Sequence, residues 1–514
     1  MIRLPLGIQT FSQIINEKMV YIDKTMYIKP LVEGYKYAFL SRPRRFGKSL
    51  FVSTLSEYFR GSRDLFKGLA IDSLQPEVWE QFPVIKLDFS RLSSVNGIEL
   101  STTLRNILVE CGSEFGVEVK GDADIEFFSS LVMGIHKKTN QRVVIIIDEY
   151  DKPIIDRLGD REIATENRQV LRNFFSVVKS LDEYIKFMFV TGVSKFTKVS
   201  LFSGFNQITD ITFNKKFAGI CGYDQNELEQ HFDQHINKMI AEMKVVRTAL
   251  LDELKKWYNG YSWDGSTRLY NPFSVLSFFD SGSFQNFWYN TGTPYFLVEL
   301  IKRERFDITA TENMIAVEES LSSDDLDRPQ LKSLLFQTGY LTIKKRNRQQ
   351  YSDYFELGFP NHEVESSFSR YLFAEMTNTE ADLTGIYAAE IKVALQRGDY
   401  ETFEKHLKFL FAKIPSNLFI PEERYFHSLF IMLASLVGIE IESEVNTNIG
   451  RIDGVLIFPD KIYIIEFKYN KSAEEAINQI VLKRYSEKYA NSGKKLINIG
   501  INFTRENIDV MIRE

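Results

Sequence analysis

Short apolar runs alternate with helical segments between residues 36 and 220, and this alternation predicts strands separated by helices. The runs are KYAFLS (36–41), FPVIKLDFS (82–90), RVVIIIDEY (142–150) and IKFMFVTG (185–192). After the first run, a helix is expected from Lys48 to Arg60, ended by Gly61. Strands that are apolar on both faces, with helices between them, indicate a parallel α/β sheet.

The pattern changes beyond this region. A helix-rich stretch follows to about residue 320, interrupted by the aromatic, turn-rich segment WYNGYSWDGSTRLYNPFS, which we interpret as a lid or connector. Residues 327–365 predict a helix and then two strands, the order of a small winged-helix unit. After Gly438 the pattern turns to strands, a helix from about Ser472 to Ala490 and a last strand, KLINIGINF. We expect an α/β multidomain chain whose three parts span residues 1–225, 226–380 and 381–514.

The composition narrows the class of protein. With 514 residues, 44% apolar and 14% aromatic, the chain can form several hydrophobic cores. It shows neither a signal-peptide pattern nor an apolar run of about 18 residues, so we expect a cytoplasmic protein without a membrane partner. Its two cysteines, Cys111 and Cys221, have no metal-like spacing. The net charge of -6 means that any nucleic-acid contact must come from local patches.

The segment SRPRRFGKSL carries the first candidate chemistry, a phosphate-binding loop. Gly47, Lys48 and Ser49 supply a helix N-terminus, a lysine for phosphate oxygens and a hydroxyl for magnesium. The strand-loop-helix context is the one that this motif requires. Arg42 stands where the first glycine of the motif is expected, and a bare G-K-S tripeptide is also an ordinary helix start. The loop alone therefore does not decide between a phosphate-binding loop and an ordinary helix start.

Two adjacent acids favour the nucleotide site. Asp148 ends the apolar run VVIIID, where it could hold magnesium through water, and Glu149 could orient an attacking water. A helix cap after the strand is the alternative. Acids that end a buried strand are costly unless something compensates them, so we favour the functional interpretation. The next strand delivers Thr191 and Ser194 to the same edge, as sensors of the γ-phosphate or as helix caps.

A second candidate site lies in the segment GRIDGVLIFPDKIYIIEFKYN. Asp453, Glu466 and Lys468 offer two oxygen ligands and a cation, which a metal-dependent phosphodiesterase needs. If the turn is centred on residues 459–460, Asp453 and Glu466 become cross-strand neighbours with Cβ atoms about 5 Å apart. Lys468 would share the face of Glu466. An exposed strand face with an ion pair is the alternative, and the apolar residues around the charges favour a cleft.

Together, the segments RPRRFGKSL, VIIIDEYDKP, VTGVSKFTKVSLFSGFN, WYNGY and YNPFS resemble those of bacterial AAA-ATPase-like proteins with a PD-(D/E)XK nuclease-like domain at the C-terminus. The resemblance covers almost the whole chain and makes Arg42 a family feature. It implies that the first part is an AAA-like P-loop ATPase domain, the second a helical lid and winged-helix-like connector, and the third a restriction-endonuclease-like α/β domain.

The resemblance also implies roles for single residues. Lys48 and Ser49 would take the nucleotide and magnesium roles, and Asp148 and Glu149 the Walker B roles. Pro43 would set the entry to the loop, with φ near about −65°. Arg44 and Arg45 would add positive charge beside the phosphates or be solvent-exposed loop charge. From the residues and the resemblance together, the expected nucleotide-binding residues are Arg42, Pro43, Arg44, Arg45, Phe46, Gly47, Lys48, Ser49, Leu50, Asp148, Thr191 and Ser194.

In the nuclease-like part, the resemblance implies a metal shell of Asp453 and Glu466, completed by a glutamate on the first core helix. Glu423 is the first candidate, Glu422 the second and Glu444 a reserve. Gln479 resembles the helix polar group that supports the site, although an exposed glutamine is an ordinary feature. Residues 461–514 contain ten Lys or Arg and seven Asp or Glu. This small excess of positive charge is compatible with contact to a phosphate backbone.

These observations lead to one expected function and one alternative. We expect ATP and Mg²⁺ to bind the first part, with Mg²⁺ or Mn²⁺ at the second site, and ATP hydrolysis to gate or power a phosphodiesterase acting on nucleic acid, DNA before RNA. The alternative is a non-cleaving ATP-dependent switch with a degenerate nuclease-like domain. No arginine finger can be identified, which leaves the hydrolysis rate and a homo-oligomeric ring open.

Overall fold

The computed structural model describes residues 1–75, 79–92, 96–195, 207–288, 314–321, 330–348, 353–378, 380–414, 422–436, 438–447 and 450–514, with the side chains of residues 381, 382, 424, 440 and 444 excepted. The chain forms two compact units. The first comprises residues 1–297 and 315–361, and the second comprises residues 298–314 and 362–514. The three-part division expected from the sequence stays a prediction.

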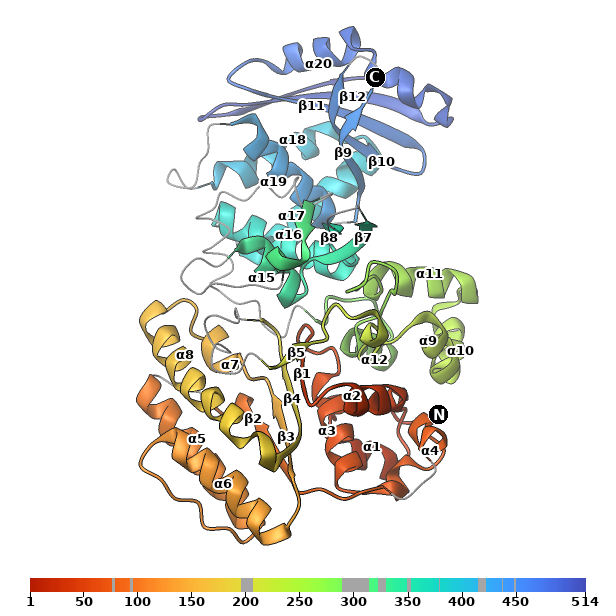
Figure 1. The fold of residues 1–514 in the computed structure, drawn as a ribbon. Coiled ribbons are helices and arrows are strands. Elements are labelled where there is room, and N and C mark those ends of the chain that lie inside the picture. The colour runs from red at the N-terminus through yellow and green to blue at the C-terminus, as the bar shows by residue number, and fades with distance from the viewer. Residues whose placement is uncertain are drawn as a thin grey trace. The chain divides into compact units, whose positions relative to one another are not determined.

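The first unit contains a five-stranded, wholly parallel sheet in the order β2-β3-β4-β1-β5 (Figure 1). Its strands are β1 (Tyr37–Ser41), β2 (Val84–Asp88), β3 (Val143–Asp148), β4 (Ile185–Gly192) and β5 (Thr209–Asp210). Parallel strands end at one edge of the sheet, and β4 lies between β1 and β3. The loop after β1 and the last residues of β3 and β4 are therefore neighbours. This sheet confirms the expected fold class.

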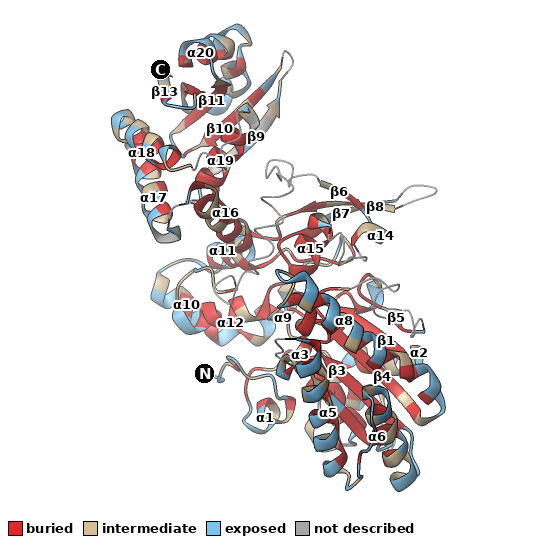
Figure 2. Ribbon diagram, turned by 90° about the vertical axis from the view of Figure 1, so that its left-hand side faces the viewer, coloured by how far each residue is buried: buried red, intermediate tan, exposed pale blue. Residues whose placement is uncertain are grey.

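Helices cover both faces of this sheet (Figure 1). Successive strand side chains point to opposite faces, so β3 and β4 are buried almost throughout, whereas α5 and α6 keep exposed outer residues (Figure 2). On one face, α3 brings Phe51 against Phe189 at 5.9 Å between ring centroids. On the other face, α5, α6 and α8 form the main core. The helices are α1 (Phe11–Asn16), α2 (Ile28–Gly34), α3 (Lys48–Phe59), α4 (Ala70–Leu74), α5 (Gly97–Glu114), α6 (Asp124–Thr139), α7 (Lys152–Ile155) and α8 (Arg161–Ser176).

A second core of the first unit lies among α9 (Gln225–His231), α10 (Asp233–Met243), α11 (Arg247–Tyr258) and α12 (Pro272–Ser281). Asn271 begins α12 as its cap, because its side chain accepts from two backbone N–H groups of the first turn. The expected helix and two strands are confirmed as α15 (Leu331–Thr338) and the antiparallel pair β7 (Thr342–Arg348) and β8 (Asp353–Gly358). The short elements β6 (Met314–Val317) and α14 (Glu318–Leu321) precede them.

The second unit contains a mixed sheet in the order β13-β12-β11-β10-β9. Only β11 and β12 pair in parallel, and α20 connects them. Gly500 in β12 lets α20 approach closely, because a Cβ there would lie 2.3 Å from the carbonyl oxygen of Ala473. The strands are β9 (Glu440–Asn446), β10 (Arg451–Ile457), β11 (Lys461–Tyr469), β12 (Lys495–Phe503) and β13 (Ile508–Arg513). The helices are α16 (His362–Thr377), α17 (Ala381–Arg397), α18 (Tyr400–Ala412), α19 (Glu423–Leu436) and α20 (Ala473–Leu482).

One expected helix is wrong in its length. The segment from Ser472 to Ala490 does not form a single helix, because α20 ends at Leu482 and Arg484 adopts a φ of 47°. A 3-10 helix (Tyr485–Ser492) follows. The break turns Tyr485 into the core under the sheet, where it is 1% exposed.

Candidate functional sites

A cavity of about 580 Å³ lies beside the carboxyl ends of β1, β2 and β3. The loop between β1 and α3, the N-terminal segment and α12 border it. Its charged lining comprises Lys24, Arg44, Arg45, Lys48, Lys86 and Lys152 against Asp88, Asp148 and Glu149. This excess of cations suits a polyanion such as a nucleoside triphosphate.

The loop after β1 turns at Arg45 and Gly47, whose φ angles of 63° and 96° lie in the left-handed region. Glycine adopts this conformation without strain, and Gly47 caps the N-terminus of α3. Lys48 is 4% exposed, and its Nζ donates to the carbonyl oxygens of Arg42 and Pro43 at 2.9 Å each. The lysine therefore braces the loop from within, at a helix N-terminus suited to phosphate.

Two acids border the cavity at the end of β3. Asp148 is 4% exposed, and its Oδ1 accepts from the Thr191 hydroxyl at 2.5 Å and from the Glu149 N–H at 3.1 Å. Glu149 has a φ of 51°, a conformation that costs a non-glycine residue about 1–3 kcal/mol and that functional sites often enforce. In the parallel register Asp148 lies beside Asp88, which ends β2. Thr191 does not border the cavity and reaches it through Asp148.

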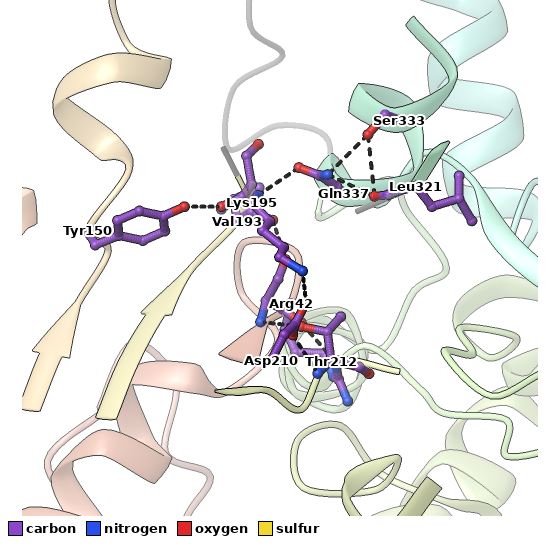
Figure 3. Close-up of polar contacts among 11 residues, drawn as sticks. Arg42, Tyr150, Val193, Lys195, Asp210, Thr212, Leu321, Ser333 and Gln337 are labelled. Carbon is purple, nitrogen blue, oxygen red and sulfur yellow. Dashed lines mark hydrogen bonds and ion pairs between the residues drawn. The ribbon is translucent and has the colours of Figure 1, made fainter. Parts of the chain in front are cut away.

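The turn after β4 is held by the residues that follow these acids and by α15 (Figure 3). The Oδ2 atom of Asp151 accepts from two successive N–H groups, the second that of Ser194, at 2.9 and 2.5 Å. Burial raises the pKa of Asp151 to about 6. The Tyr150 hydroxyl donates to the carbonyl oxygen of Ser194 at 2.9 Å, and the N–H of Lys195 donates to Gln337 Oε1 at 2.9 Å. Ser194 is thus part of a fixed turn and does not border the cavity.

Arg42 lies outside the cavity, in a fully buried position. Its guanidinium donates to the carbonyl oxygens of Ser41, Thr212 and Phe217 at 2.8, 3.2 and 3.1 Å and lies 4.0 Å from the ring centroid of Trp263. Burial lowers the pKa of Arg42 to about 10, so it stays protonated at neutral pH. The Arg42 side chain therefore ties the start of the loop to the segment after β5, and the place of Arg42 among the nucleotide-binding residues stays a prediction.

The aromatic segment interpreted as a lid packs against the same loop. Phe46 meets Tyr261 and Trp263 edge-on, with ring centroids 5.1 Å apart in each case. Arg45 lies over Phe273, 4.9 Å from its ring centroid. These contacts fix the loop from outside, in addition to the lysine that braces it from within.

Replacing Arg42 by alanine is expected to lower the free energy of unfolding of the first unit by at least about 3 kcal/mol, because each hydrogen bond to a charged group contributes about 1.5–3 kcal/mol. Urea titration with tryptophan fluorescence measures this, since all 4 tryptophans lie in the first unit. The control is Arg60→Ala, which removes an exposed arginine paired with Glu57 at 3.1 Å and should shift stability by about 0.5 kcal/mol or less. Equal midpoints for both variants would contradict the structural role.

The second candidate site lies where β10 and β11 meet α19 and α20. β10 and β11 pair with Gly454 opposite Ile465, which confirms the register expected from a turn at residues 459–460. Gly454 and Ile465 form the last pair of this ladder among the described residues. Asp453, which precedes Gly454 in β10, contacts β11 through its side chain. The Oδ2 atom of Asp453 accepts from the backbone N–H of Phe467 at 2.8 Å, which places this carboxylate at the end of the ladder beside β11.

Glu466 and Lys468 are buried on one face of β11, at 2% and 6% exposure. Lys468 Nζ donates to Glu466 Oε1 at 2.9 Å, and Gln479 Nε2 on α20 donates to the same oxygen. The other oxygen, Oε2, is buried and accepts no hydrogen bond from the residues that the structure describes. Burial, and then the charge of Asp453, raise the pKa of Glu466 to about 7.

This arrangement fits a divalent cation. The unpartnered Glu466 oxygen lies near a second carboxylate, that of Asp453, whose pKa is also raised by burial. A cation beside these oxygens would favour their ionised forms, and Mg²⁺ commonly binds one or two carboxylates together with water. Within the described ranges, no group of three or more His, Cys, Asp or Glu side chains is placed to hold a metal ion.

Helix α19 adds two further polar groups. Glu423 begins this helix, and its Oε2 lies 4.0 Å from Lys468 Nζ; burial raises the pKa of Glu423. His427 follows one turn later, and its Nε2 donates to the backbone carbonyl oxygen of Asp453 at 2.7 Å. Glu422 is exposed and precedes the helix. The side chain of Glu444, the reserve candidate, lies outside the described residues.

Comparison with known proteins assigns both regions. Residues 5–202 match the family model described as predicted AAA-ATPase, and residues 421–512 match a PD-(D/E)XK nuclease superfamily model. The chain is 33% identical over 520 residues to the "Uncharacterized protein in vnfD 5'region" of Azotobacter chroococcum mcd 1, covering 99% of this chain and 98% of that protein. The chain belongs to the AAA-ATPase-like proteins that carry a PD-(D/E)XK nuclease domain. This confirms the resemblance noted in the sequence.

In the AAA-ATPase-like domain the expected nucleotide-binding residues divide into two groups. Arg42, Pro43, Thr191 and Ser194 do not border the cavity. Those that border it are Arg44, Arg45, Phe46, Gly47, Lys48, Ser49, Leu50 and Asp148. Glu149, expected to orient the attacking water, borders it as well. In the PD-(D/E)XK domain, Asp453, Glu466, Lys468, Gln479 and Glu423 lie together. None of the described helices is long and apolar enough to cross a membrane.

Several residues at the two sites were missed from the sequence. Asp88 ends the apolar run FPVIKLD as Asp148 ends VVIIID, and this parallel could have pointed to it. Lys86 and Lys152 also border the AAA-ATPase cavity. His427 lies four residues after Glu423, so both occupy one face of α19. Lys152 lies in the segment VIIIDEYDKP that carries the resemblance, but nothing in that segment singles out its side chain, and no local pattern marks Lys86.

Proposed function

We propose that this protein binds and hydrolyses ATP in its AAA-ATPase-like domain and that the nucleotide governs a metal-dependent phosphodiesterase in its PD-(D/E)XK domain. The substrate is nucleic acid, with DNA to be tested first. The observation that carries the proposal is the buried cluster around Glu466. There, one carboxylate oxygen is held by Lys468 and Gln479, while the other is buried without a partner among the described residues.

The first half of the proposal is supported by the cavity beside β1 and β3. Lys48 would bind the β- and γ-phosphate oxygens, and its Nζ already lies where the loop's carbonyl oxygens converge. Ser49 and Asp148 would hold Mg²⁺, which when bound neutralises phosphate charge. Glu149, which borders the cavity beside Asp148, would orient the attacking water. Thr191 would hold Asp148 in place through its hydroxyl.

The second half is supported by the residues that surround the two carboxylates. Asp453 and Glu466 would hold a divalent cation, which supplies a water nucleophile and polarises the phosphodiester. Burial alone would lower the pKa of Lys468, but its hydrogen bond to Glu466 and the nearby acids raise it, so the ammonium stays charged. Lys468 would steady charge on the phosphate. Gln479 orients Glu466, and His427 orients the backbone at Asp453.

The non-cleaving switch is the weaker alternative. A degenerate nuclease domain would have lost one of its essential groups, yet Asp453, Glu466 and Lys468 are all present. Glu466 and Lys468 are buried, with the half-buried Asp453 beside them. Such a group is costly to keep without a function, because desolvation opposes each charge.

Cleavage assays test the proposal. The purified protein is incubated with supercoiled plasmid, linear duplex DNA and RNA, with Mg²⁺ or Mn²⁺, and with or without ATP. The proposal expects metal-dependent cutting by the wild type and none by Asp453→Ala. Equal cutting by both proteins would sink the assignment of the nuclease site. Cutting of RNA alone would overturn the proposed order of substrates.

A further inference from the structure

The three arginines of the loop have different surroundings. Arg44 and a second cation at the cavity pair with the same carboxylate. Arg42 is buried, and Arg45 lies over Phe273. Arg44 Nη2 lies 3.2 Å from Asp156 Oδ1, and Lys152 Nζ lies 2.8 Å from the other oxygen of the same carboxylate. One carboxylate therefore holds two cations, one on each oxygen.

Both cations border the nucleotide cavity, whereas Asp156 does not. Lys152 begins α7 directly after the acidic segment, and its N–H donates to the carbonyl oxygen of Glu149 at 3.1 Å. The backbone of Arg44 is held as well, because Trp288 Nε1 donates to its carbonyl oxygen at 3.1 Å. Arg44 and Lys152 thus come from two separately anchored segments of the chain and meet at Asp156, beside the space that Lys48 and Glu149 also border.

An ordinary surface ion pair is the competing explanation. The side chains of Arg44, Lys152 and Asp156 are 35%, 31% and 43% exposed, and pairs of this kind contribute little to stability. Stability therefore gives no reason for placing two cations at this wall. The transfer of a γ-phosphoryl group gives such a reason, because negative charge is then spread over the equatorial oxygens of that group and nearby cations stabilise it.

We propose that Arg44 and Lys152 are cis-acting catalytic cations for ATP hydrolysis, with Asp156 as the positioning residue that keeps both at the cavity. This inference rests on the proposed ATP hydrolysis. In that reaction the water oxygen forms a bond to the γ-phosphorus while the bond from phosphorus to the β,γ-bridging oxygen breaks. ADP leaves with that electron pair, inorganic phosphate forms, and Glu149 accepts a proton from the water. Arg44 and Lys152 donate hydrogen bonds to the γ-oxygens as their charge redistributes.

This assignment answers the question of the arginine finger. Nucleotide hydrolases obtain such a cation either from the same chain or from a neighbouring subunit. With Arg44 and Lys152 in the same chain as Lys48 and Glu149, one subunit contains every group needed. Hydrolysis then does not require a ring.

Steady-state kinetics on the full chain separate the catalytic role from a surface ion pair. Arg44→Ala is expected to lower kcat for ATP hydrolysis by about 10³-fold or more, with the Kd for ATP nearly unchanged because the contact is made in the transition state. Lys152→Ala should lower kcat in the same way by a smaller factor. Asp156→Asn, which keeps both cations, should lower kcat much less. The control is Arg60→Ala, an exposed arginine with an ion pair away from the cavity.

The relative losses of kcat in these variants distinguish catalytic cations from a structural ion pair. A merely structural pair predicts equal losses for Arg44→Ala and Asp156→Asn, and that result would overturn the inference. Wild-type kcat in both Arg44→Ala and Lys152→Ala would overturn it as well. An unchanged Kd for ATP shows that each variant is folded around its cavity, so a loss of kcat cannot be assigned to misfolding.

A mixing experiment tests the claim that the cations act in cis. Arg44→Ala, which lacks the cation, is mixed with Lys48→Ala, which lacks nucleotide binding but keeps Arg44. The inference predicts no recovery of ATP hydrolysis at any ratio. Recovery would show that Arg44 acts across subunits and would overturn the cis assignment. If the wild type itself hydrolyses no ATP, the proposed function is wrong. If the wild type hydrolyses ATP and Arg44→Ala does so equally well, the proposed function stands and the role of Arg44 is wrong.

Discussion

Lys48→Ala is expected to bind ATP at least about 100-fold more weakly than the wild type, because it loses charged hydrogen bonds to phosphate that contribute about 1.5–3 kcal/mol each. The loop itself should persist, since Arg42 and the aromatic segment hold it from outside. Isothermal titration with ATP and Mg²⁺ measures the change.

The matched control for Lys48 is Lys67→Ala. Lys67 is 72% exposed, pairs with Asp64 and does not border the cavity, so its loss should leave ATP affinity unchanged. An unaltered affinity in Lys48→Ala would show that the cavity beside β1 is not the phosphate site. Weakening of equal size in both variants would point to a general effect of charge.

Glu466→Gln is expected to lower metal-dependent cleavage by more than about 100-fold, because changing a residue that merely supports a metal ligand already costs about 10–100-fold. The amide keeps the size of the side chain and an oxygen that can accept from Lys468 and Gln479. It removes the charge that would bind the cation. Cleavage rates at saturating Mn²⁺, with binding of Mn²⁺ measured separately, distinguish a loss of metal from a loss of fold.

The control for Glu466 is Glu474→Gln, which changes an exposed acid on α20. It should cleave as the wild type does. If Glu466→Gln keeps both metal binding and cleavage, the cluster around β11 is a structural ion pair and the nuclease assignment is wrong.

Much of both sites follows from local sequence. The turn at residues 459–460 sets the register of β10 and β11, so the proximity of Asp453 to β11 was predictable from spacing alone. Gly47 and Lys48 follow a strand and open a helix, and Asp148 ends an apolar run. Each of these inferences uses residues close together in the chain, where periodicity and turn geometry are informative.

The missed features depend on distant contacts. Judged by its neighbours in the sequence, Arg42 is an ordinary cation of the loop. Its contacts with Thr212, Phe217 and Trp263 give it a buried structural role. His427 acquires its position from the packing of α19 against β9 and β11, which brings its ring to the carbonyl oxygen of Asp453. The Arg44 partner Asp156 lies far along the chain and has no motif of its own. Such roles arise when folding brings separate segments together, and no local pattern records them.

The dependence of cleavage on nucleotide joins the two sites in one measurement. Cleavage rates of the wild type and of Lys48→Ala are compared with and without ATP, at one saturating concentration of Mg²⁺ and on one DNA substrate. The account predicts that ATP changes the wild-type rate and leaves the rate of Lys48→Ala at its value without nucleotide. A wild-type rate that is the same with and without ATP, or an equal response of the variant, would contradict it.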